Sequence, residues 1–212
     1  MKAKARRKSN LAAYGRGDYA TALRLLRPLA EQGNAIAQLD LGTVYWNGQG
    51  VPQDQAEAVK WYRKAADQGD AEGQYHVGLA YDDGEGVPRN GAEAVKWYRK
   101  AADQGNASAQ YKLGSMYEHG WGVSLDYVEA AKWYGKAADR AHKLAQYYLG
   151  KMYANGHGVP QDYVQADMWF NIATSLGLGA EADRDKIAKL MTPAQIAEAQ
   201  ELAREWKPKP ER

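Results

Sequence analysis

The chain has 212 residues, of which 45% are hydrophobic and 25% are charged, and this suits one globular or repetitive domain or two small ones. It contains no cysteine, which excludes a disulfide framework, a thiolate nucleophile and cysteine-ligated zinc. It also contains no apolar run of about 18 residues, so no transmembrane segment is expected.

Residues 1–9 are strongly basic and are expected to form a flexible, solvated tail. Their five positive charges lie on Lys2, Lys4, Arg6, Arg7 and Lys8. Because the net charge of the whole chain is only +2, the remainder is slightly acidic, and no nucleic-acid partner is expected. No apolar segment follows the basic start, so the sequence as written predicts a cytoplasmic protein; a leader removed from it would make the protein periplasmic or exported.

Residues 10–34 are expected to be a degenerate N-terminal capping copy of a repeat that the following residues carry in full. Leu25 stands 36 residues before Trp61, in the position that later copies fill with tryptophan. Pro28 falls inside the second helix of this copy, where it should kink the helix.

Residues 35–178 contain four full copies of a 36-residue unit, beginning at residues 35, 71, 107 and 143. The stretch AEAVKWYRKAADQG occurs at 56–69 and again at 92–105. The period is marked by tryptophan at 61, 97, 133 and 169, by glycine at 42, 78, 114 and 150, and by tyrosine at 45, 81, 117 and 153. Such a period is typical of stacked repeats, in which each unit needs a neighbour to bury its apolar face.

Each repeat is expected to contain two antiparallel helices. The first follows a good N-cap residue, which is Asn34, Asp70 or Asn106, and ends at a glycine suited to the left-handed conformation. The second opens with the spacing of a capping box, as in Asp54-x-x-Glu57. The third repeat ends with Ala141 in place of glycine and His142 in place of a good cap, so a distorted or frayed junction is expected there.

The recurring glycines and tryptophans are interpreted as packing elements. Glycine inside a helix costs about 1 kcal/mol relative to alanine, so a neighbouring helix is expected to approach the backbone closely at Gly42 and its equivalents. Trp61 shares a stripe of the second helix with Ala58 and Ala65. A tryptophan in the same place in every repeat indicates core rather than a ligand site.

After Gly179 the period is lost, and residues 179–206 are expected to form C-terminal capping helices. Thr192 to Gln195 has the pattern of a capping box with proline at its first helical position. The apolar stripe that would cover the end of the array is Ile196, Ala199, Ala203 and Trp206. Residues 207–212 are expected to be a flexible tail.

The repeat resembles the SEL-one-like repeat, a relative of the tetratricopeptide repeat. Residues 107–141, ASAQYKLGSMYEHGWGVSLDYVEAAKWYGKAADRA, carry the resemblance, and the other three copies fit nearly as well, so that it covers about two-thirds of the chain. The resemblance implies an all-α fold, an α-α superhelix in which antiparallel helix pairs stack into a solenoid. It also implies an adaptor or scaffold role through protein binding.

No motif of a catalytic, cofactor or metal site is present, and none of these is expected. The four histidines, His76, His119, His142 and His157, form no His-Glu-x-x-His pattern, and the glycine-rich turns do not lead into a phosphate-binding loop. His119 and His157 lie in successive inter-helix loops and could approach each other; the alternative is that both are solvated.

The residues that differ between repeats are the candidate partner contacts. On the first helices, four positions at i, i+4, i+7 and i+11 form one face that does not repeat. In the family that the sequence resembles, first helices line the concave surface. The candidate contacts on this face are Asp40, Thr43, His76, Leu79, Asp83, Lys112, Ser115, His119, Tyr148 and Lys151. The alternative is that an unconstrained solvent face simply varies.

Two tryptophans outside the pattern are further candidates, because tryptophan is enriched at binding hot spots. Trp46 replaces the acidic or small residue of the other repeats, and Trp121 replaces a polar loop residue. The alternative is that each packs on a neighbouring repeat.

The sequence therefore predicts a non-enzymatic, monomeric adaptor or scaffold that binds a protein or peptide segment in the concave groove of an α-solenoid. Two alternatives stay open. One is an envelope-associated hydrolase or peptidoglycan-related enzyme whose site is assembled from several repeats, and the other is a structural spacer.

Overall fold

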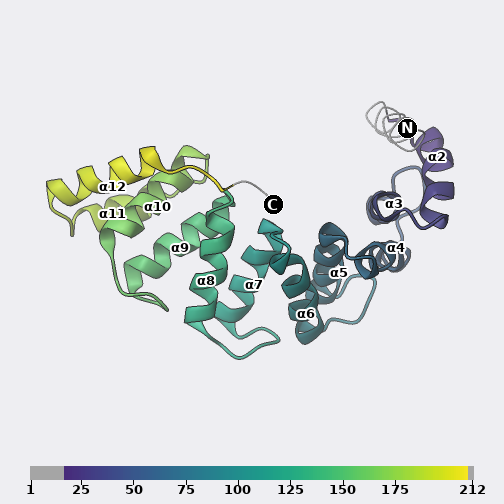
Figure 1. The fold of residues 1–212 in the computed structure, drawn as a ribbon, viewed down its shortest axis with the longest axis horizontal. Coiled ribbons are helices and arrows are strands. Elements are labelled where there is room, and N and C mark those ends of the chain that lie inside the picture. The colour runs from purple at the N-terminus through teal and green to yellow at the C-terminus, as the bar shows by residue number, and fades with distance from the viewer. Residues whose placement is uncertain (1–16, 210–212) are drawn as a thin grey trace. The chain divides into compact units, whose positions relative to one another are not determined.

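The computed structural model describes residues 17–209, which form helices and no strand (Figure 1). The expected basic tail lies outside the described residues, as does most of the chain before α2. The helices are α2 (Tyr19–Glu31), α3 (Ala35–Asn47), α4 (Gln55–Asp67), α5 (Ala71–Asp83), α6 (Gly91–Asp103), α7 (Ala107–His119), α8 (Tyr127–Ala138), α9 (Lys143–Asn155), α10 (Tyr163–Ser175), α11 (Glu181–Ala188) and α12 (Pro193–Glu205). The prediction of an all-α fold is confirmed.

Contacts divide the chain into two compact units, residues 1–101 and 102–212. In the N-terminal unit, α3 packs on α2, α4 on α3 and α5 on α4. In the C-terminal unit, each of α8, α9 and α10 packs on the helix before it, and α11 and α12 both pack on α10. Packing of each element on its chain neighbours is the arrangement of a solenoid, and this prediction is also confirmed.

The first helices of the repeats begin and end where the sequence predicts. The side chains of Asn34, Asp70 and Asn106 each accept a hydrogen bond from the backbone N–H three residues later, at 2.7–2.9 Å. The four glycines that follow these helices are all left-handed, with φ between 66° and 77°. These ends depend on residues close in sequence, so local chemistry is enough to predict them.

At the start of the second helices, one of the two hydrogen bonds of the predicted capping box is present. Asp54 accepts from the backbone N–H of Glu57 at 2.9 Å, and its equivalents do the same. The glutamate at the third helical position pairs with a lysine three residues further on, as Glu57 does with Lys60 at 2.9 Å. Both bonds of a capping box are present at Thr192 and Gln195.

The recurring glycines lie against aromatic rings of the second helix. These rings are the largest fully buried side chains among the described residues: Tyr62, Tyr98, Tyr134 and Phe170. A Cβ atom added at Gly42, Gly78, Gly114 or Gly150 would lie only 2.6–2.8 Å from the nearest ring carbon. The close approach expected from the sequence is therefore made mainly by a side chain rather than by a helix backbone.

The recurring tryptophans are buried, as predicted. Trp61 packs with Leu26 and Leu41, and Trp97 packs with Tyr62 and Val77, so each contacts helices that precede its own. A lysine three residues later covers the ring of Trp61, Trp97 and Trp133, with Nζ 3.6–3.9 Å from the ring centroid. Such cation–π contacts stabilise the outer side of a buried ring.

The junction after the third repeat is distorted but not frayed. Helix α8 has 12 residues, one fewer than α4, α6 and α10, and Ala141 takes the left-handed conformation with φ of 62°. His142 nevertheless caps α9, because its Nδ1 accepts from the backbone N–H of Ala145 at 3.3 Å. Of the two outcomes expected, distortion is therefore the one observed, and the cap is kept because a neutral imidazole nitrogen can accept the bond that an asparagine oxygen accepts elsewhere.

The C-terminal helices are held on α10 and α9 by the predicted stripe and by one polar contact. Ala199 is buried, and the ring of Trp206 meets that of Trp169 edge to face, with centroids 6.0 Å apart. The hydroxyl of Tyr147 donates to Asp183 Oδ2 at 2.6 Å. After α12 the chain returns to α8, where the backbone N–H of Lys209 donates to the carbonyl oxygen of Asp139 at 2.7 Å.

Helix α2 continues through Pro28 as one element. The kink expected at this residue stays a prediction.

Candidate partner-binding surfaces

All twelve predicted contact residues are at least partly accessible. Asp83, His119 and Trp121 are exposed, and the other nine are half-buried. Those on the first helices lie on α3, α5, α7 and α9. Several of them also support the core, which the sequence did not reveal.

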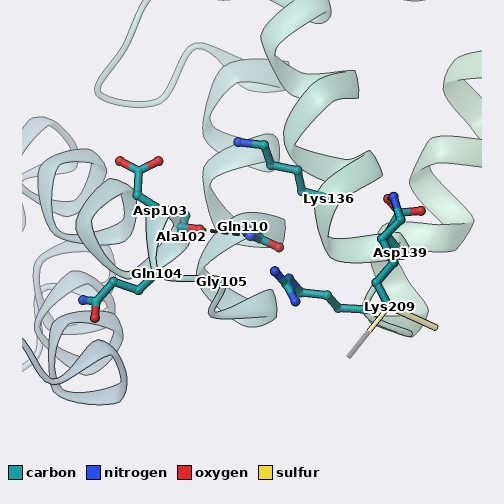
Figure 2. Close-up of a pocket in the computed structure, with 9 residues that line it drawn as sticks. Ala102, Asp103, Gln104, Gly105, Gln110, Lys136, Asp139 and Lys209 are labelled. Carbon is teal, nitrogen blue, oxygen red and sulfur yellow. Dashed lines mark hydrogen bonds and ion pairs between the residues drawn. The ribbon is translucent and has the colours of Figure 1, made fainter. Parts of the chain in front are cut away.

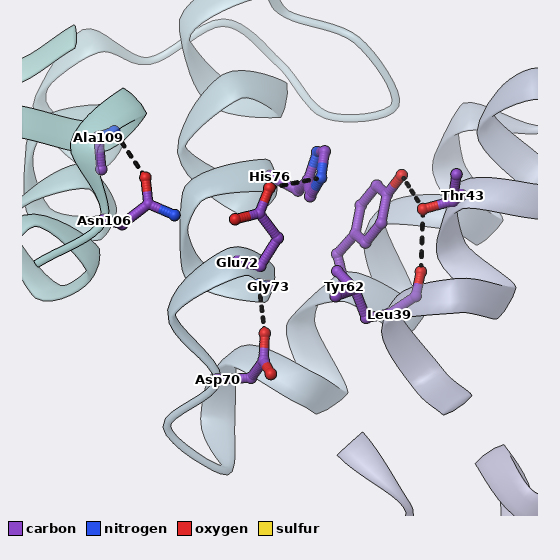
Figure 3. Close-up of polar contacts among 9 residues, drawn as sticks. All are labelled: Leu39, Thr43, Tyr62, Asp70, Glu72, Gly73, His76, Asn106 and Ala109. Atoms are coloured by element: carbon purple, nitrogen blue, oxygen red, sulfur yellow. Dashed lines mark hydrogen bonds and ion pairs between the residues drawn. The ribbon is translucent and has the colours of Figure 1, made fainter. Parts of the chain in front are cut away.

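In the N-terminal unit, three predicted residues surround the buried ring of Tyr62, and Figure 3 shows two of them, Thr43 and His76. The imidazole of His76 stacks on this ring, with centroids 4.5 Å apart and planes 11° from parallel. The Tyr62 hydroxyl donates to Thr43 Oγ1 at 3.4 Å, and the ring of Trp46 lies at 6.1 Å. Trp46 thus packs on a core ring of its own repeat, whereas the alternative interpretation placed it on a neighbouring repeat.

Burial lowers the pKa of His76, while Glu72, with Oε1 3.6 Å from His76 Nε2, acts in the opposite direction. Burial is the larger cause, so the neutral imidazole is favoured. His76 therefore carries a neutral imidazole that is stacked on a core ring.

In the second, third and fourth repeats, the residue equivalent to Trp46 follows the chemistry of the buried ring in the same repeat, whereas in the first repeat Thr43 accepts from the Tyr62 hydroxyl instead. Where the ring carries a hydroxyl, an acid can accept from it: Tyr98 donates to Asp82 at 3.2 Å and Tyr134 to Glu118 at 2.6 Å. Where the ring is Phe170, the corresponding residue is Ala154. Burial, with these carboxylates, raises the pKa of both tyrosines far above the usual range, so the hydroxyls remain donors.

In the C-terminal unit, Tyr148 belongs to a strip of stacked rings. It lies 5.5 Å from Tyr134 at 17° and 6.0 Å from Tyr111. Tyr111 in turn stacks on His142 at 4.7 Å. The ammonium group of Lys151 lies 5.7 Å from the ring centroid of Tyr148. Tyr111 was missed because tyrosine recurs at the equivalent position of other repeats. His142 was missed because it was considered only as a weak cap.

Trp121 is one of four exposed apolar side chains that lie close in sequence, in the inter-helix loop of the third repeat and at the start of α8. Its side chain is 51% exposed and stacks on His119, with centroids 4.4 Å apart. Leu125 is 54% exposed and Val128 is 63% exposed. Tyr127 stacks on His157 at 5.0 Å. We call Trp121, Leu125, Tyr127 and Val128 the third-repeat patch.

Leu125 replaces a residue that has a structural role in the other repeats. Gln53, Arg89 and Gln161 each donate to the carbonyl oxygen seven residues earlier, at 2.8 Å. Leucine cannot make this bond, so the third repeat has an exposed apolar side chain where its relatives have a useful polar one. Comparing positions 53, 89, 125 and 161 would have found this signal in the sequence.

His119 and His157 each stack on a different ring rather than forming a pair. Within residues 17–209, no group of three or more histidine or acidic side chains is placed to hold a metal ion. Over the same range, no helix is long and apolar enough to cross a membrane.

Comparisons with known proteins identify the repeat. The model of the Sel1 repeat matches residues 10–34, 35–70, 71–106, 107–142 and 143–178. The structure is similar to a Sel1 repeat protein from Oxalobacter formigenes, with 32% identity, a TM-score of 0.77 and coverage of 91% of this chain and 84% of that one.

A second similar structure is c5321, a protective antigen of uropathogenic Escherichia coli, with 33% identity and a TM-score of 0.59; 89% of this chain aligns with 48% of that one. No match was found among curated proteins. Sel1 repeat proteins generally act as scaffolds for protein–protein interaction. The five matched segments span most of the sequence, and the chain belongs to the Sel1 repeat family.

Proposed function

We propose that the protein is a non-enzymatic adaptor that binds a peptide or protein segment along the first-helix face, in the concave groove of the solenoid. The third-repeat patch forms a further contact at the rim. The general role of the family in protein–protein interaction supports an adaptor.

The observation that carries the proposal is the third-repeat patch. Leu125 and Val128 are more than half exposed, and neither is required by the repeat. Exposed apolar surface is costly in water unless a partner covers it, and such surfaces mark interaction sites. A spacer without a ligand would need no such patch.

The partner chemistry follows from the side chains present. Trp121 and Leu125 suit an apolar anchor residue, since aromatic side chains dominate binding energy at interface centres. The first-helix face offers a neutral imidazole at position 76, an ammonium at 112 and a phenol at 148. A segment with an apolar anchor and alternating polar groups fits this surface.

The test replaces patch residues by those that other repeats carry. The double variant Trp121→Gln and Leu125→Gln copies Gln49 and Gln53 of the first repeat. The matched control is Glu85→Gln and Arg89→Gln in the second repeat, at the equivalent positions. A photo-crosslinking residue at Ser115 should capture a saturable partner with the wild type and the control, and much less with the patch variant.

Capture that is equal in all three proteins contradicts the role of the patch. Melting temperatures separate binding from folding. The patch variant should melt no lower than the wild type, because a glutamine at position 125 regains the bond to a helix carbonyl.

A further inference from the structure

A glutamine recurs on every first helix and holds the preceding second helix. Its Nε2 donates to a carbonyl oxygen eight residues earlier, at 2.9–3.2 Å, and the four residues are Gln38, Gln74, Gln110 and Gln146. Because the nitrogen is fixed in this bond, the amide oxygen must point to the other side. The hydrogen bond made by Nε2 therefore fixes the orientation of each side-chain amide.

The oxygen of this amide has a donor in the first repeat. Gln68 Nε2 donates to Gln38 Oε1 at 2.7 Å. The third repeat has Arg140 at the position of Gln68. No group among residues 17–209 donates to Gln110 Oε1, although Gln110 is only 3% exposed. A buried acceptor without a donor is destabilising, so this oxygen is a site for a donor from outside.

Gln110 lines a cavity of about 490 Å³ within the C-terminal unit. Figure 2 shows the Gln110 amide with its nitrogen on Ala102 and its oxygen on the opposite side, facing the space between the lining residues. A volume of this size holds a small ligand or a peptide end. Gln146 Oε1 also has no donor within the described range, but Gln146 does not line this cavity.

The cavity wall carries more positive than negative charge. Its cations are Lys136, Arg140 and Lys209, and its acids are Asp103 and Asp139. Asp139 pairs with Lys209, and the Nη2 atom of Arg140 lies against Gly105, where a Cβ would be only 3.0 Å away. The guanidinium thus sits close to the backbone at the turn before α7. A glycine at 105 leaves room for it.

We propose that this cavity binds the carboxyl-terminal residue of a peptide. The backbone N–H of that residue donates to Gln110 Oε1, and its carboxylate is bound by the guanidinium of Arg140. The N–H and the carboxylate of a terminal residue are separated by one carbon atom, so one small group meets both requirements. Charge-assisted bonds between guanidinium and carboxylate are strong and directional.

This site is separate from the first-helix face and from the third-repeat patch. It uses the end of α6, the start of α7 and the end of α8, and it does not depend on the function proposed above. Its presence would give the adaptor a way to recognise a free chain end.

The first experiment compares three probes. N-acetyl-Ala-Ala carries both groups, N-acetyl-Ala-alaninamide lacks the charge, and acetate lacks the N–H. Titration followed by isothermal calorimetry and by the ¹H–¹⁵N signal of the Gln110 side chain should show saturable binding of N-acetyl-Ala-Ala. The other two probes should bind at least about tenfold more weakly, because each loses one of the two interactions.

The second experiment uses variants that keep the fold. Arg140→Gln copies the first two repeats, and its amide can donate to Gln110 Oε1 as Gln68 does to Gln38. This variant should melt at a higher temperature and bind N-acetyl-Ala-Ala at least about tenfold more weakly. Gln110→Met should also weaken binding, whereas Gln146→Met loses the same helix–helix bond and should leave affinity unchanged.

Three results would overturn the proposal. One is the absence of saturable binding, which would mean that water fills the cavity. Another is equal affinity for the acid and the amide. The last is an equal loss of affinity in the variants at 110 and 146.

Discussion

Tyr62 and its equivalents show how one residue constrains several others in each repeat. The ring fills the space that a side chain at Gly42 would need, and its hydroxyl requires an acceptor from the first helix. Where phenylalanine replaces tyrosine, the acid is no longer needed and Ala154 stands in its place. A buried hydroxyl without a partner would be destabilising, which explains why an acid accompanies Tyr98 and Tyr134 but not Phe170, while Thr43 serves Tyr62.

Substitution of one of the recurring tryptophans should be far more destabilising than substitution of Trp121. Trp97 is buried against Tyr62 and Val77, so Trp97→Ala should lower the free energy of unfolding by about 3–5 kcal/mol. Trp121→Ala removes a half-exposed side chain and should change it by about 0.5 kcal/mol or less. Urea denaturation measures both, and similar losses in the two variants would contradict the packing described here.

The cap at His142 should make stability depend on pH. Burial lowers the pKa of His142, so its folded-state pKa lies below the unfolded value. The stability that the neutral ring contributes is present above the unfolded pKa and is lost as pH falls through the folded pKa. His142→Asn, which copies Asn34 and Asn106, should keep the cap and reduce the fall in melting temperature between pH 8 and pH 5.

His76 titrates in both proteins, so the difference between the two melting curves reports on His142 alone. Parallel curves for the wild type and the asparagine variant over this range would show that the cap does not depend on a neutral imidazole.

At the scale of elements, helix α10 differs from the second helices before it because it meets the terminal helices. Asp167 is 1% exposed and stands where earlier repeats carry Val59, Val95 and Ala131. Asn171 Nδ2 donates to its carboxylate at 2.8 Å. The last repeat thus buries an acid at a position that is apolar elsewhere.

Asp167→Val should stabilise the protein at neutral pH. Burial raises the pKa of Asp167, so the folded state disfavours the ionised form. The stability that the protonated carboxyl contributes is fully present below the pKa of the unfolded state. It is lost as pH rises through the pKa of the folded state. The variant should therefore melt higher than the wild type at pH 7, with the difference shrinking toward pH 3.

A lower melting temperature at pH 7 would mean that the bond to Asn171 outweighs the burial of charge. Asn171→Leu in the Asp167→Val background controls for the amide that this substitution leaves without its carboxylate partner.

Element boundaries were predictable from the sequence because caps and left-handed glycines act over a few residues. Asn34, Gly48 and Thr192 behave as their types suggest. The cap by His142 was not predictable, because histidine accepts only when one particular ring nitrogen is unprotonated and turned to the helix. The partner of each glycine was not predictable either, since Trp61 and Tyr62 are adjacent and only packing decides which ring meets Gly42.

At the scale of the whole molecule, the period alone was enough to predict the solenoid, because within each compact unit successive helices pack on one another. The candidate site was less accessible to sequence reasoning. The differences between repeats identified Trp121 but not Leu125. Leu125 stands out only when the hydrogen bond made by the equivalent Gln53 is known. Variation also selected His76 and Tyr148 without showing that both stack on core rings.

A permutation of the first-helix face tests whether the order of its side chains matters. His76, Lys112 and Tyr148 occupy equivalent positions in three successive repeats. The triple variant His76→Lys, Lys112→Tyr and Tyr148→His therefore conserves composition. Each new side chain is one that another repeat carries at the equivalent position. Affinity for a captured partner should fall at least about tenfold, with secondary structure by circular dichroism unchanged. Undiminished affinity would show that this face does not read the partner.

The contact between Lys209 and Asp139 joins residues 70 positions apart, whereas most of the described helices pack on the helix before them. A linear array can open from its end one helix at a time, because each terminal helix has a single interface to lose. Here the segment after α12 is fastened to the end of α8, so α9 to α12 are enclosed in one loop. Amide hydrogens in these four helices should therefore exchange together rather than in graded order from the carboxyl end.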